Sequence, residues 1–140
     1  MYSINKIEID VSLWADKLLK LERLDEHWTS VLQLLKSLYR NCNLNDFNAF
    51  IEDRSIEYEQ LVVYFVYRYF VQSDYSPASI VLFSSFAYYL IYAIGAVIYS
   101  ERKVFSYNDQ LEIIRMFSSE IEYSTDNFIS VVNSLKNAFL

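Results

Sequence analysis

Glycine and proline are almost missing from this chain, with one of each among 140 residues. Folds built from β-strands need many tight turns, and tight turns use these two residues heavily. Their scarcity therefore favours long helices joined by short polar loops. The length and the apolar fraction of 54% are enough for a single domain, residues 1–140, with a sizeable core.

Cysteine and histidine are equally scarce, with Cys42 and His27 as the single examples. One cysteine excludes a disulfide within the chain, and it also excludes a cysteine cluster for zinc or iron–sulfur. We therefore predict no metal site in this chain. The lone glycine argues in the same way against a glycine-rich loop for phosphates or nucleotides.

Basic residues are outnumbered, with 12 Lys and Arg against 18 Asp and Glu, and the net charge is -6. The longest basic run is Arg102 with Lys103. Nucleic-acid backbones require a basic surface, so we predict no nucleic-acid partner. Residues 1–10 show no basic segment followed by an apolar stretch, which predicts a cytoplasmic protein without a signal peptide.

One long segment, residues 75–100, carries no charge and is long enough to cross a bilayer. Several serine and tyrosine hydroxyls reduce its apolar character. A central helix that is covered on all sides by other helices has the same composition. We favour a buried helix in a soluble protein, and a membrane-spanning helix remains the alternative.

Apolar residues at helical spacing predict an all-α, single-domain bundle of six to seven helices. We expect the fourth and fifth helices at its centre, the fifth fully apolar, with amphipathic helices around them. Gly95 lies inside the fifth helix, where it would allow a close helix crossing. The predicted helices span residues 11–23, 26–40, 46–52, 56–71 and 77–99, and two more begin after Ser106 and near Thr125 or Asp126. Their predicted caps are Asp10 or Ser12, Asp25, Ser55, Ser76 before Pro77, and Ser106 with Asp109.

Arg68 is the only charged residue between Glu59 and Asp74, inside a very apolar predicted helix. Tyr64 lies one turn before it on the same helix face. A buried guanidinium needs a carboxylate partner, because an unpaired buried charge is strongly destabilising. The candidate partners are Glu120 and Glu122.

Asn127 follows this acidic pair and completes a candidate site of Tyr64, Arg68, Glu120, Glu122 and Asn127. Two interpretations are open. In the first, which we favour, Arg68 and one glutamate pin two helices together. In the second, these residues line a pocket for a substrate lysine or a cofactor.

Two stretches of the chain form recognisable motifs: YEQLVVYFVYRYF at residues 58–70 and SSEIEYSTDN at residues 118–127. They resemble the C-terminal region of the flagellin lysine-N-methylase family, whose patterns are E-x-L-x-x-Y-F-x-x-R-x-F and S-R-E-I-E-H-S-x-x-N. The resemblance covers residues 56–140. Ser119 and Tyr123 stand where the family has arginine and histidine.

The resemblance implies a bacterial, cytoplasmic protein-lysine N-methyltransferase that uses S-adenosylmethionine. It implies flagellin as substrate and a cysteine-rich, metal-binding N-terminal region as a second partner. That cysteine-rich region is absent here, so we expect this chain alone to be inactive and to lack an S-adenosylmethionine site of its own; the catalytic residues stay unassigned. The alternatives are a non-catalytic helical interaction module and a small membrane protein.

Overall fold

A computed structural model describes residues 9–72 and 74–140, and these residues form helices and no strand. The all-α prediction is confirmed. Most of the segment behind the signal-peptide prediction, residues 1–8, lies outside the described residues. The α-helices are α1 (Val11–Leu19), α2 (Glu26–Leu38), α3 (Leu44–Phe50), α4 (Ser55–Gln72), α5 (Pro77–Arg102), α6 (Tyr107–Phe117) and α7 (Thr125–Phe139). Shorter elements are the 3-10 helices η2 (Tyr39–Asn41) and η3 (Glu52–Arg54) and the π-helix η4 (Ser118–Glu122).

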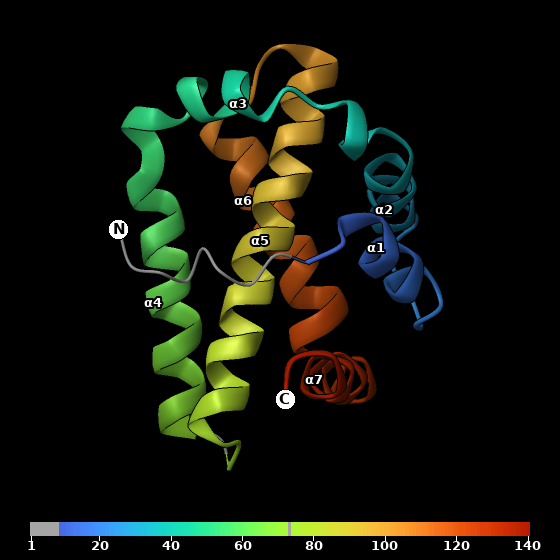
Figure 1. The fold of residues 1–140 in the computed structure, drawn as a ribbon, viewed down its shortest axis with the longest axis vertical. Coiled ribbons are helices and arrows are strands. Elements are labelled where there is room, and N and C mark those ends of the chain that lie inside the picture. The colour runs from blue at the N-terminus through green and yellow to red at the C-terminus, as the bar shows by residue number, and fades with distance from the viewer. Residues whose placement is uncertain (1–8, 73) are drawn as a thin grey trace.

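Helix α5 runs the length of the molecule and organises the bundle (Figure 1). Helix α4 packs along one side of α5, and the α1–α2 pair packs on the other side. Helix α6 passes behind α5 in this view, α7 is seen end on beside the lower part of α5, and both helices contact α5 and η4. The chain thus brings α4 and η4, which are far apart in sequence, to the same core.

The apolar helix α5 is mostly buried by its neighbours. In its most apolar window 78% of the residues are buried, and Phe86, Leu90 and Ile91 are fully inaccessible. By length and composition alone α5 could cross a membrane. Its burial is that of the core helix of a soluble protein, which confirms the predicted central apolar helix.

Helix α4 is not a second central helix, and that part of the prediction is wrong. Its inner face buries Tyr58, Leu61 and Phe65 against the core. Its outer face leaves Val63 66% and Tyr67 70% exposed. The sequence suggested burial all round because aromatic and branched residues occupy both faces, and composition alone cannot tell a covered apolar face from an open one.

The helix starts follow the predicted caps. Asp10 accepts from the Leu13 N–H at 3.1 Å, and Asp25 accepts from the His27 N–H at 2.8 Å. Ser106 and Asp109 form the reciprocal capping box at the start of α6. Ser55 differs, because it is the first residue of α4.

Other boundaries shift. Helix α1 ends at Leu19 instead of residue 23, so residues 20–25 form a loop before α2. Helix α3 begins at Leu44 after an Asn43 cap, and it buries Phe47 but leaves Phe50 37% exposed. Phe47 therefore belongs to the core, whereas Phe50 stays partly open to solvent.

Gly95 does allow a close approach, although by side chains instead of a crossing backbone. A Cβ added at Gly95 would lie 3.1 Å from Cζ of Phe105 and 3.1 Å from Cζ of Phe47. Both rings are almost fully buried. The one glycine of the chain therefore serves aromatic packing against α5.

Candidate functional site

Arg68 of α4 reaches the π-helix η4 through its guanidinium. Nη1 donates to the hydroxyl of Tyr64 at 2.6 Å and to the hydroxyl of Tyr123 at 3.4 Å. Nε lies 3.6 Å from Oε1 of Glu122. The guanidinium also lies over the rings of Tyr64, Tyr69 and Tyr123, with its carbon 5.1 to 5.9 Å from the ring centres.

Glu122 has a fully buried side chain, whereas the Arg68 side chain keeps 26% of its surface exposed. Oε1 of Glu122 accepts from the Tyr69 hydroxyl at 2.8 Å, and Oε2 accepts from the Ser118 hydroxyl at 2.6 Å. A buried carboxylate is stable only with such partners. The Glu122 carboxylate thus holds α4 against η4.

Protonation in this cluster follows from its contacts. The hydrogen bonds to Tyr123 and Tyr64, with Glu122 nearby, raise the pKa of Arg68 further above its usual value. Burial, and after it the hydrogen bond to Glu122, raises the pKa of Tyr69 well above its usual range. Arg68 is therefore a fixed cation, and Tyr69 is a neutral donor at physiological pH.

Glu120 turns away from Arg68, so of the two candidate acids only Glu122 reaches the guanidinium. Glu120 is 1% exposed and accepts from the backbone N–H of Leu24 at 3.0 Å and of Asp25 at 2.9 Å. Asp25 caps α2, so Glu120 adds a negative charge at the positive end of that helix. Residues two apart in a helical segment face different sides, which sends Glu120 and Glu122 to different partners.

Asn127 belongs with Glu120. Its amide Nδ2 donates to the backbone carbonyl of Glu22 at 2.8 Å and to that of Glu120 at 2.9 Å. The five predicted residues therefore form two clusters. The Arg68 cluster contains Tyr64, Arg68 and Glu122, and the loop cluster contains Glu120 and Asn127, which fasten residues 20–25.

Sequence reasoning missed three members of the Arg68 cluster, namely Tyr69, Ser118 and Tyr123. The sequence could have predicted Ser118, because it lies four residues before Glu122 and thus on the same helix face. Tyr69 directly follows Arg68, and its hydroxyl donates to Glu122. Tyr123 is 66% exposed and ends the π-helix, where its N–H donates to the Ser118 carbonyl at 3.0 Å.

The described residues offer little to a nucleotide-like cofactor or a metal. Among them, no three His, Cys, Asp or Glu side chains gather closely enough to hold a metal ion. One open groove of about 830 Å³ runs along residues 19–26 and is lined mainly by charged and polar groups. The space beside Gly95 is filled by the two phenylalanine rings.

Comparisons with known proteins extend the resemblance beyond its predicted limits. A family model described as the FliB lysine N-methylase C-terminal domain matches residues 4–139. The match includes residues 4–55, which lie before the predicted limit of the resemblance. No curated protein and no solved structure matches. The chain belongs to the FliB lysine N-methylase C-terminal domain family.

Proposed function

We propose that this chain is the helical C-terminal part of a bacterial, cytoplasmic enzyme that methylates lysine side chains of flagellin with S-adenosylmethionine. The observation that carries the proposal is the family match over residues 4–139. The family is that of a lysine N-methylase domain. Flagellin, the cofactor and the compartment are our inference from the resemblance of residues 58–70 and 118–127.

In this proposal the domain has a structural role in the reaction and supplies no catalytic group. The groups that touch Glu122 are internal hydroxyls and Arg68, so this carboxylate is already satisfied within the domain. The contacts favour a helix-pinning role for Arg68 over a pocket for the substrate lysine. We therefore propose that S-adenosylmethionine and the catalytic groups belong to another region of the enzyme, and that the domain alone is inactive.

A reconstitution experiment tests this assignment. The chain would be mixed with the remaining part of the methylase, flagellin and S-adenosylmethionine, and methyl-lysine would be measured by mass spectrometry. We expect methylation only when both parts are present. Methylation by this chain alone would overturn the structural role, and no association between the two parts would overturn the membership of one enzyme.

A second candidate function, a helical interaction module without a role in methylation, is favoured by one observation. The outer face of α4 exposes large apolar side chains that no described element covers. The same reconstitution separates the candidates, because an interaction module leaves the methylation of flagellin unchanged when it is omitted.

A further inference from the structure

The exposed face of α4 carries a regular stripe. Its members recur at alternating steps of four and three residues, the spacing of a coiled-coil seam. Four of the five are apolar, with exposed fractions of 53% for Ile56, 66% for Val63, 70% for Tyr67 and 50% for Phe70. We call this set the α4 stripe: Ile56, Gln60, Val63, Tyr67 and Phe70.

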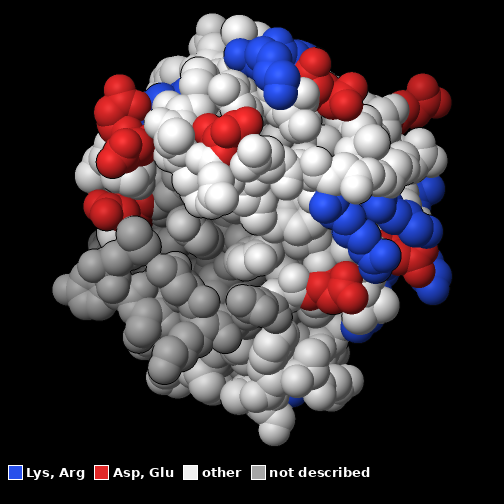
Figure 2. All heavy atoms as spheres, turned by 45° about the horizontal axis from the view of Figure 1, so that its top comes forward, with Lys and Arg blue, Asp and Glu red and all other residues white. Residues whose placement is uncertain are grey.

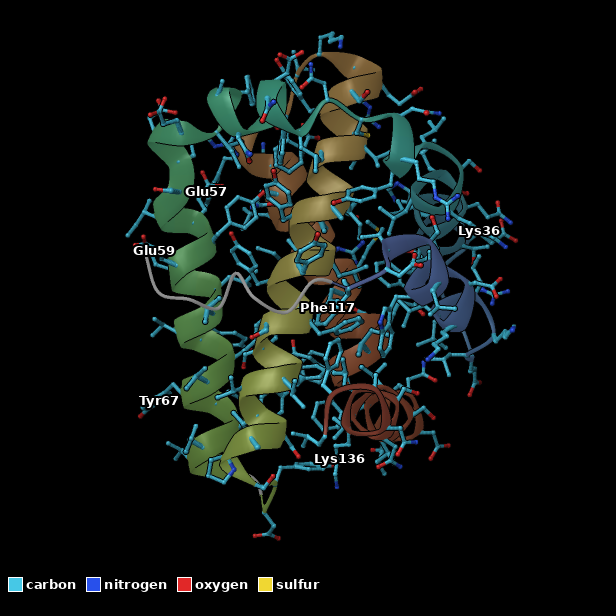
Figure 3. All side chains as sticks on the ribbon, viewed as in Figure 1. Lys36, Glu57, Glu59, Tyr67, Phe117 and Lys136 are labelled. Carbon is cyan, nitrogen blue, oxygen red and sulfur yellow. The ribbon has the colours of Figure 1, made fainter. Side chains whose placement is uncertain are left out.

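The α4 stripe is wide as well as regular. Tyr64 and Val71 extend it on one flank, with 43% and 64% of their surfaces exposed. Together with the four apolar members they expose on the order of several hundred Å² on one helix, a size at which an exposed apolar patch marks an interaction site. A surface of this size approaches one side of a standard protein interface. Figure 3 shows the Tyr67 side chain pointing away from the bundle.

The charges around the stripe are acidic. Glu59 borders it and Asp74 follows its last turn, and both are exposed without an ion-pair partner among the described residues. The two arginines of the region are engaged, Arg54 with Glu57 at 2.7 Å and Arg68 with Glu122. Figure 2 shows acidic side chains over the start of α4, while most basic side chains lie over the α1–α2 side.

The charge pattern selects among possible occupants. A second copy of this chain would bring a second acidic rim against the first, and like charges across an interface are unfavourable. An anionic membrane surface would be repelled for the same reason. A helix with an apolar seam and basic flanks satisfies both the spacing of the stripe and the charge of its rim.

We propose that the α4 stripe binds a basic amphipathic α-helix of a partner protein. The apolar seam of that helix packs on Val63, Tyr67 and Phe70, and its lysine or arginine side chains meet Glu59 and Asp74. This inference is independent of the methylase assignment, because it depends only on the exposed face of α4 and its charges.

A designed peptide provides the probe. It has about two and a half heptads, which matches the 18 residues of α4, with leucine at the seam and lysine at both flanks. A control peptide keeps the leucines and has glutamate at the flanks. Binding of each labelled peptide to the 140-residue chain would be measured by fluorescence anisotropy. We expect the lysine peptide to bind at least about tenfold more tightly than the glutamate peptide.

Matched variants distinguish binding of the lysine peptide to the α4 stripe from its general attraction to an acidic protein. The double variant Val63→Glu/Tyr67→Glu adds two negative charges within the stripe, yet we expect it to weaken lysine-peptide binding by about tenfold or more. The control Leu13→Glu/Leu111→Glu adds the same charge at exposed positions elsewhere and should bind as the wild type does. Circular dichroism would verify that all variants remain helical.

Three results would overturn the proposal. The first is no binding of the lysine peptide. The second is binding that survives or tightens in Val63→Glu/Tyr67→Glu, since this is the behaviour of charge attraction alone. The third is dimerisation of the wild-type chain in sedimentation experiments that the same double variant abolishes, since a second copy would then be the occupant.

Discussion

Oε1 of Glu122 lies 3.6 Å from Nε of Arg68 and thereby links α4 to the π-helix that follows α6. The two side chains differ in exposure, since the carboxylate is fully buried and the guanidinium is partly open to solvent. The pair therefore anchors α4, and its buried member, the Glu122 carboxylate, also depends on the hydroxyl donors of Tyr69 and Ser118.

Removing the guanidinium should destabilise the domain without unfolding it. In Arg68→Met, Glu122 keeps its two hydroxyl donors but loses its cation, and we expect a loss of about 2 kcal/mol in the free energy of unfolding. Urea denaturation measures this loss. The control is Arg115→Met, whose ion pair with Glu112 is exposed to solvent and should contribute little to stability. Equal effects of the two variants would contradict an anchoring role for Arg68.

The loop cluster should depend on Glu120. In Glu120→Gln, an amide group that carries its own N–H replaces a carboxylate that accepts from Leu24 and Asp25, and we expect a loss of about 2 kcal/mol. Hydrogen exchange should accelerate at the Leu24 and Asp25 amides before it does in α5. Exposed Glu59 has no such contacts, so Glu59→Gln should leave both quantities unchanged. Unaltered exchange at residues 24 and 25 in Glu120→Gln would argue against this account of the loop.

Gly95→Ala tests the aromatic packing against α5. Alanine improves helix propensity by about 1 kcal/mol, but its Cβ would meet two buried rings at 3.1 Å. Overpacking of this kind costs about 1–3 kcal/mol, so we expect a net loss of stability in thermal unfolding. The double variant Gly95→Ala/Phe105→Leu should recover part of that loss. A clear gain of stability in the single variant would show that the rings can move aside.

Asp109 should make the stability of the domain depend on pH in the acid range. Its hydrogen bond from the Ser106 N–H lowers the pKa of this carboxyl below its usual value of 3.8. Because the folded pKa is lower than the unfolded one, the stabilisation is complete above the unfolded pKa and disappears as pH falls through the folded pKa. Asp109→Asn should therefore be less stable than the wild type by about 1 kcal/mol near neutral pH, and the difference should shrink in strong acid. A difference that stays constant with pH would contradict this assignment.

Much of the fold follows from local chemistry in the sequence. The Ser106–Asp109 capping box and the Ser76–Pro77 start were predictable because their partners lie within one helical turn. The buried α5 followed from its uninterrupted apolar composition. The outer face of α4 was not predictable, because the same aromatic and branched residues suit a core and an open surface.

The site was predictable only in part for a similar reason. The need of Arg68 for a carboxylate indicated that α4 and η4 meet, and the structure brings Glu122 to it. The choice between Glu120 and Glu122 depends on the rotation of η4 about its axis. A π-helix changes that rotation, and no feature of the sequence of residues 118–122 predicts a π-helix there. The attachment of Glu120 to the loop also required knowing that α1 ends at Leu19.

The most direct test of the proposed function is the methyl-lysine content of flagellin in bacteria that carry or lack the gene for this chain. Flagellin would be purified from the wild type, the deletion strain and the complemented strain, and its lysines would be examined by mass spectrometry. Our account predicts that methyl-lysine disappears in the deletion strain and returns on complementation. Unchanged methylation in the deletion strain would contradict it.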